Sequence, residues 1–123
     1  MKTIAVVGAS SDRRKFGNKC VRAYQRAGYQ VYPVNPRESE VEGLPAFPSL
    51  AEVPEPLDRI SVYLPPPVTL QALPVMAAKQ AGEVWFNPGA ADGAVLAEAR
   101  RLGIPVVSGC SIVDVGFSPA QFP

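Results

Sequence analysis

The sequence predicts an α/β fold in which a five-stranded parallel sheet lies between two layers of helices. Five short runs of apolar, β-prone residues alternate with segments whose apolar residues recur at helical spacing. The apolar runs show no polar alternation, as expected of strands that helices cover on both faces. This order of elements is typical of a Rossmann-like three-layer sandwich.

The first three elements form a β-α-β unit. A strand is expected at residues 3–7, followed by a helix at residues 16–27 and a second strand at residues 30–34. Gly28 stands where a left-handed helix cap is favoured, and Pro36 stops the second strand. A right-handed crossover places the two strands side by side.

The second half of the chain supplies three more strands and two helices. The strands are expected at residues 60–64, 84–86 and 104–108, and the helices at residues 68–80 and 92–102. Three prolines at residues 65–67 impose an extended exit from the third strand, because each lacks an N–H group and restricts its predecessor. Pro74 is expected to kink or divide its helix, and Asp92 and Gly103 bound the last helix.

Two segments fall outside these elements. Residues 37–56 are rich in Glu, Pro and Gly and are expected to form a loop with one helical turn at residues 49–52. The tail from Cys110 to Pro123 is apolar enough to pack on the sheet, although residues 119–123 are expected to be loose.

Composition limits the classes of function. Residues 1–123 are expected to form one domain, and a net charge of +1 argues against general nucleic-acid binding. No apolar run reaches the length of a membrane span or a signal-peptide core, so no membrane partner and a cytoplasmic location are expected. The absence of histidine removes the Ser-His and Cys-His nucleophile pairs and the most frequent zinc ligand. No catalytic or metal-binding residue is therefore assigned.

The loop between the first strand and the first helix is a candidate anion site. Gly8 permits a tight turn, small residues let backbone N–H groups approach a phosphate, and the helix N-terminus adds positive potential. Adjacent cations beside that positive end favour a polyphosphate ligand. Ser10 replaces the middle glycine of the dinucleotide fingerprint, so a tight connection with a solvated cationic tip stays open. The candidate residues are Gly8, Ala9, Ser10, Ser11, Arg13, Arg14 and Lys15.

The segment after the second strand discriminates between nucleotides. An NAD site has Asp or Glu there for the ribose hydroxyls, whereas this chain has Asn35, Pro36 and Arg37. Asn35 can hydrogen-bond a ribose, and Arg37 can meet the 2′-phosphate of NADP or the 3′-phosphate of coenzyme A. A turn asparagine and a solvated arginine are the alternative interpretation.

Four segments carry a resemblance to a known family. They are residues 4–10, residues 28–36, residues 43–45 with 48–50, and residues 84–86. Together they resemble the CoA-binding domain family, whose small stand-alone members are similar to the N-terminal domain of the succinyl-CoA synthetase α-subunit. The most specific parts are the Gly-Ala-Ser loop and the run from Gly28-Tyr29 to Asn35-Pro36.

The resemblance, which covers nearly the whole chain, implies that coenzyme A, free or acylated, lies across the strand ends. It implies that the phosphates face the Gly-Ala-Ser loop and the cations that follow, and that Asn35, Pro36 and Arg37 lie near the nucleotide. It also implies ligand contacts after the third and fourth strands, from Tyr63, Leu64, Pro65 and Asn87, with Pro88 and Gly89 as neighbours of the pantetheine.

The chain departs from the family pattern at three places. Residues 64–67 read Leu-Pro-Pro-Pro where many relatives have a basic residue, and residues 87–89 read Asn-Pro-Gly in place of a Gln-containing loop. Cys110 stands in a Ser-Gly-Cys-Ser context in place of Asp-Arg-Cys. The synthetase phosphorylates a histidine in a second domain, and this chain lacks both, so ligase activity is not expected.

Three functions are compatible with these residues. The first is a coenzyme A binding protein without catalytic activity, and the second is an NADP-binding oxidoreductase with Tyr63 or Lys79 as the proton donor. The third is a regulatory interaction module that has lost its ligand. A mixed disulfide between Cys110 and coenzyme A is a further hypothesis, with an inert thiol as its alternative.

Overall fold

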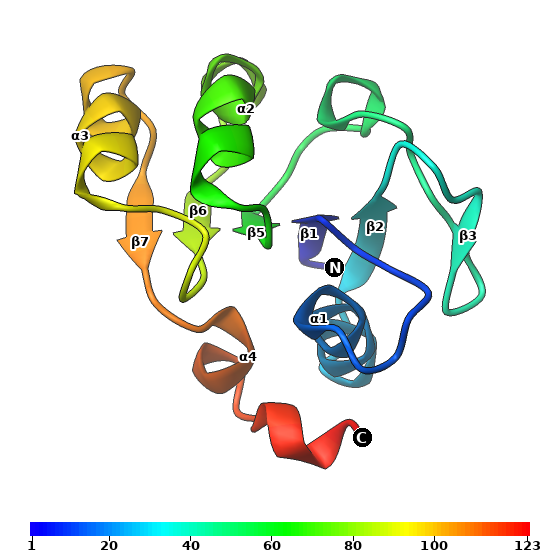
Figure 1. Ribbon diagram of the computed structural model, residues 1–123. Helices are drawn as coiled ribbons and strands as arrows, with labels where there is room; N and C mark the ends of the chain where they lie inside the picture. Colours follow the sequence, from blue (N-terminus) through cyan, green and yellow to red (C-terminus); the bar gives the residue numbers. More distant parts are fainter.

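The computed structural model describes residues 1–123 and contains the predicted five-stranded parallel sheet, with strand order β2-β1-β5-β6-β7 (Figure 1). Every pair of neighbouring strands in this sheet is parallel. The chain thus has the Rossmann-like α/β fold that the sequence predicts. Its strands are β1 (Thr3–Val7), β2 (Gln30–Val34), β5 (Arg59–Val62), β6 (Glu83–Phe86) and β7 (Val106–Ser108), and its helices are α1 (Phe16–Arg26), α2 (Pro66–Lys79), α3 (Gly93–Arg101) and α4 (Ser111–Asp114).

Helices cover both faces of the sheet, as Figure 1 shows: α2 and α3 lie on one face, and α1, α4 and the C-terminal segment lie on the other. Alternate residues of β1 point to opposite faces of the sheet. Ala5 and Val7 belong to the core under α2 and α3, whereas Ile4 and Val6 belong to the core under α1. Because both faces are buried, β1 has no exposed residue, which explains its lack of polar alternation.

The helix α2 is continuous through Pro74, contrary to the expected division, and it begins at Pro66. The prolines at its start cost nothing because the first N–H groups of a helix have no partner within it. Pro74 removes one internal hydrogen bond, which leaves the carbonyl of Leu70 without its usual donor. Leu70 is 45% exposed, so water can hydrogen-bond that carbonyl.

Within the segment predicted to be a loop lies a small antiparallel hairpin of β3 (Glu40–Val41) and β4 (Leu44–Pro45). Its two turn residues, Glu42 and Gly43, both have positive φ, as the tightest hairpin turns require. Strands of two residues are too short to give a periodic signal, so the sequence did not predict them. The expected helical turn is present as a 3₁₀ helix at Leu50–Glu52.

The C-terminal tail joins the core between α1 and the sheet, in keeping with the expected packing on the sheet, but its last five residues are not loose. Pro119–Gln121 form a 3₁₀ helix capped by Ser118, and Phe122 is 1% exposed. Arg22 donates a hydrogen bond to the Phe122 carbonyl at 3.0 Å, and the Arg26 guanidinium lies 4.7 Å from the centre of the Phe122 ring. One buried aromatic residue anchors the chain end.

None of the helices has the length and apolar character needed to cross a bilayer.

Candidate functional site

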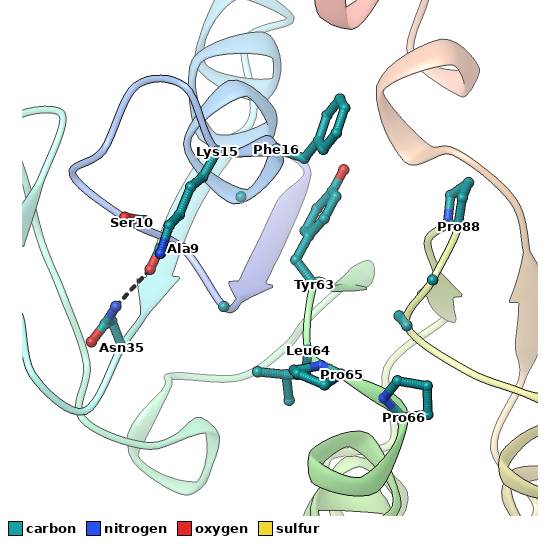
Figure 2. A pocket seen from close by; sticks show the side chains of 14 residues that line it. Ala9, Ser10, Lys15, Phe16, Asn35, Tyr63, Leu64, Pro65, Pro66 and Pro88 are labelled. Atoms are coloured by element: carbon teal, nitrogen blue, oxygen red, sulfur yellow. Dashed lines mark hydrogen bonds between the residues drawn. The ribbon is translucent and has the colours of Figure 1, made fainter.

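A cleft lies along the carboxyl ends of the parallel strands, where ligands bind in sheets of this kind. It has a volume of about 530 Å³ and crosses the ends of β2, β1, β5 and β6 (Figure 2). Its walls come from the loop between β1 and α1, the first turn of α1, and the segments that follow β2, β5 and β6. The lining residues are Gly8, Ala9, Ser10, Lys15, Phe16, Gly17, Asn35, Tyr63, Leu64, Pro65, Pro66, Pro88, Gly89 and Ala90.

Two glycines allow the loop, the helix and the end of β5 to approach closely. Gly8 has a φ of 90°, and a Cβ atom there would lie 2.2 Å from the Tyr63 carbonyl oxygen. A Cβ atom on Gly17 would lie 2.2 Å from the Gly8 carbonyl oxygen. Backbone contacts this close exclude any side chain at either position. Because both positions are glycine, the first turn of α1 packs directly against the glycine turn. Residues of both turns therefore line the same end of the cleft.

Six of these lining residues have backbone N–H groups with no hydrogen-bond acceptor in the chain. Leu64 and Gly89 follow β5 and β6, and the other four lie on the glycine turn and the first turn of α1: Ala9, Ser10, Phe16 and Gly17. Lys15, at the N-cap position of α1, provides no side-chain cap for the helix. Unpaired N–H groups on a turn and at a helix N-terminus are free to bond an acceptor from outside the chain, and the positive end of the helix dipole favours a negatively charged one.

The cations beside this site differ in their surroundings. Arg14 is paired with Asp12, with Nε and Oδ1 3.1 Å apart, and its hydrogen bonds lower the pKa of the Asp12 carboxyl to about 2. The Arg13 Nε atom lies 3.6 Å from the Glu42 carboxylate. Only Lys15 lines the cleft, and it has no carboxylate partner (Figure 2). Of the three cations that the sequence places beside the helix N-terminus, two thus have an internal carboxylate in place of an external anion.

The residues after β2 fix the loop from its outer side. Asn35 donates to the Ala9 carbonyl oxygen at 2.8 Å and accepts from the Arg37 N–H group at 2.7 Å. Glu38 accepts hydrogen bonds from the Ser11 N–H group at 2.9 Å and from the Ser11 hydroxyl. It also accepts from the Asn35 amide at 3.3 Å. A carboxylate thus occupies the outer edge of the loop, and the sequence signal for it was an acidic residue shortly after the second strand.

The structure gathers part of the predicted set into the cleft. The predicted residues that line it are Gly8, Ala9, Ser10, Lys15, Asn35, Tyr63, Leu64 and Pro65, together with Pro88 and Gly89, which the resemblance placed near the pantetheine. The predicted residues outside its lining are Ser11, Arg13, Arg14, Pro36, Arg37 and Asn87. Sequence reasoning did not select Phe16, Gly17, Pro66 and Ala90, which also line it. The displaced glycine at the start of the helix was the available signal for Gly17.

Asn87 joins the C-terminal segment to the sheet and is 2% exposed. Its amide donates to the Ser61 hydroxyl and to the Val62 carbonyl oxygen, each at 2.9 Å, and its carbonyl accepts from the Ser111 N–H group at 2.9 Å. These bonds satisfy both ends of the side chain. The geometry is that of a structural residue, because leaving either end unpaired in the core is costly.

The cleft offers donors and positive charge in place of reactive groups. Its titratable side chains are Lys15 and Tyr63. Burial raises the pKa of the Tyr63 phenol, which therefore stays protonated at neutral pH and can donate a hydrogen bond. No group of three or more His, Cys, Asp or Glu side chains is arranged to hold a metal ion.

The strand order and the position of the cleft place the chain among Rossmann-like α/β proteins. The sequence model described as "CoA binding domain" matches residues 2–116. The chain belongs to this CoA binding domain family.

Relatives include enzymes and stand-alone proteins. The chain is 30% identical over 116 residues to acetate–CoA ligase (ADP-forming) I of Archaeoglobus fulgidus, which covers 86% of this chain and 17% of the ligase. It is 42% identical over 73 residues to the α-subunit of acetate–CoA ligase (ADP-forming) II of Pyrococcus furiosus, covering 57% of this chain and 16% of that subunit. A solved structure of a conserved hypothetical protein of Pyrococcus furiosus, 33% identical, superposes with a TM-score of 0.85 over 93% of this chain and 99% of that one. The chain thus spans about a sixth of these ligase sequences and nearly all of the small protein.

Proposed function

We propose that the chain is a coenzyme A binding protein without catalytic activity, which holds the coenzyme phosphates at the Gly8–Ser10 loop and the N-terminus of α1. The observation that carries this proposal is the set of unpaired N–H groups on the glycine turn and the first helical turn. A diphosphate supplies several acceptor oxygens at once, and the helix dipole and the Lys15 ammonium favour its charge. Membership of the CoA binding domain family supports this choice among diphosphate ligands.

The proposal also includes an orientation for the ligand. The nucleotide lies toward the end of β2, where Asn35 and Pro36 face the ribose and Arg37 reaches the 3′-phosphate. The pantetheine arm runs the other way, past Tyr63, Leu64 and Pro65. Arg37 is exposed outside the cleft lining, so it can turn toward a phosphate without breaking an ion pair.

The groups that the cleft presents support the part of the proposal that concerns catalysis. The residues that line the cleft include no carboxylate, imidazole or thiol to act as a general base, and burial raises the pKa of the Tyr63 phenol, which keeps it protonated at neutral pH. The ligase relatives are much longer than this chain, and their reactions are not transferred to it. The proposed role is to hold coenzyme A and present its thiol end.

Calorimetric titration with coenzyme A, dephospho-CoA and NADP tests the proposal. We expect saturable binding of coenzyme A, with Lys15→Gln weakening it about threefold to tenfold because an ion pair to a phosphate is lost. Lys2→Gln, at an exposed position outside the cleft, is the matched control. We expect dephospho-CoA to bind more weakly, and Arg37→Gln to remove that difference.

Three results would overturn parts of this account. No binding of coenzyme A removes the proposed function and leaves the ligand-free interaction module. Equal affinity for coenzyme A and dephospho-CoA removes the role of Arg37. Tighter binding of NADP than of coenzyme A favours the nicotinamide alternative.

A further inference from the structure

A second hollow of about 230 Å³ adjoins the cleft. It is lined by Phe16, Tyr63, Asn87, Pro88, Cys110 and Pro119. Phe16, Tyr63 and Pro88 also line the cleft, so the two spaces share these walls (Figure 2). The hollow is therefore an extension of the proposed coenzyme site and not a separate pocket.

The position of the hollow follows from the strand order. The cleft runs from Asn35, after β2, past the ends of β1 and β5 to Pro88, after β6. The hollow adds Cys110, which follows β7, the next strand of the sheet. It thus lies at the opposite end of the site from the nucleotide. In the proposed orientation, this is the end that the thiol of coenzyme A reaches.

The walls of the hollow are mostly apolar. Aromatic and proline rings supply four of the six lining residues, and none of the six is charged. The Asn87 amide is fully engaged in hydrogen bonds to the protein and is not available to a ligand. The Tyr63 hydroxyl has one hydrogen-bond contact, at 3.5 Å to the Ser111 hydroxyl. Because this contact is long, the hydroxyl can donate a hydrogen bond to a better-placed acceptor. The hollow suits an apolar group that carries one acceptor.

An uncharged acyl thioester has this chemistry. On the basis of the coenzyme A site proposed above, we propose that the hollow takes the acyl group of a short-chain acyl-CoA, with the Tyr63 hydroxyl donating to the thioester carbonyl. At the roughly 30 Å³ that a water molecule occupies in the liquid, a volume of about 230 Å³ holds about seven groups of that size, enough for the sulfur and carbonyl of the thioester and an acyl chain of about four carbons. A free carboxylate at the end of the acyl chain has no cation to meet there, so charged acyl groups are excluded.

The affinity of the unmodified protein for a series of ligands tests this inference. Coenzyme A, acetyl-CoA, butyryl-CoA, octanoyl-CoA and succinyl-CoA are compared by calorimetric titration. We expect affinity to rise about fourfold for each methylene that is buried, up to butyryl-CoA. Octanoyl-CoA gains nothing further, and succinyl-CoA binds no better than coenzyme A.

The outcomes separate the two proposals. If coenzyme A does not bind, the proposed function fails. If coenzyme A binds but the acyl series is flat, or if succinyl-CoA binds most tightly, the coenzyme site stands and the acyl hollow is overturned.

Variants of the hollow give a second test. Cys110→Leu adds side-chain volume to the hollow and is expected to abolish the gain from acetyl-CoA to butyryl-CoA. Val113→Leu enlarges an exposed side chain of the same segment and is the matched control, expected to keep the gain. Cys110→Ser is close to cysteine in size and is also expected to keep it, which excludes thiol exchange as its source. A folded Cys110→Leu variant that retains the full gain overturns the inference.

Discussion

Replacing Gly8 by alanine tests the close packing on which the site depends. Two costs add at this position. Alanine at a φ of 90° costs about 1 kcal/mol or more, because its Cβ atom disfavours the left-handed region. The new Cβ atom would also lie 2.2 Å from the Tyr63 carbonyl oxygen, and relieving such an overlap by backbone shifts costs about 1–3 kcal/mol. We expect the variant to lose about 2–4 kcal/mol of unfolding free energy.

Gly28→Ala is the matched control. Gly28 has a φ of 86°, nearly that of Gly8, but no atom lies within 4 Å of a Cβ atom built there. Its loss is therefore the conformational cost alone, about 1 kcal/mol. Urea denaturation followed by circular dichroism gives both values. Equal losses for the two variants would refute the reasoning, because they would show that the approach of the loop to β5 adds nothing.

Three further predictions concern other parts of the molecule. Glu38→Gln removes the carboxylate that holds the outer edge of the loop and is expected to tighten coenzyme A binding about threefold to tenfold in calorimetry; weaker binding would contradict this. Phe122→Ala is expected to cost about 3 kcal/mol or more in urea denaturation, whereas a cost under about 1 kcal/mol would mean that the tail is loose. Burial raises the pKa of Tyr63, so the folded state favours its neutral phenol, and this contribution to stability is lost as pH rises above the ordinary pKa of about 10. Tyr63→Phe should therefore lose less unfolding free energy than the unmodified protein between about pH 9 and pH 11; an equal loss would contradict the shift.

The sheet and its main helices were predictable because their residues carry strong periodic signals. Strands β1 and β2 have the expected bounds, since each is a compact run ended by Gly8 or Pro36. The helix α3 begins after the expected Asp92 cap, whose side chain accepts from the Val95 N–H group at 2.9 Å. In these cases the local preference and the tertiary environment agree.

The errors arise where tertiary contacts override local preference. Proline breaks helices in general, but here the affected carbonyl belongs to the exposed residue Leu70, and α2 continues through Pro74. The last residues have the composition of a frayed end, yet the burial of Phe122 beside α1 orders them. Neither contact can be read from nearby residues.

At the candidate site, too, local features were predictable and tertiary contacts were not. The glycine turn and the helix N-terminus are local features, and the sequence located both. The pairing of Arg13 with Glu42 depends on a hairpin that the sequence did not predict, and Glu38 reaches the loop only because β1 and β2 are adjacent. Predicting which charges at a site are paired thus requires knowledge of the fold, whereas the backbone donors can be predicted from the sequence alone.

The most direct test of the central claim is to follow every backbone amide by NMR while coenzyme A is added. The account predicts that the largest shift changes fall on Ala9, Ser10, Phe16 and Gly17, whose N–H groups have no acceptor in the chain. These four lie on the glycine turn and the first turn of α1. Saturable binding that leaves their amides unchanged, with the changes elsewhere on the molecule, would contradict the proposed phosphate site.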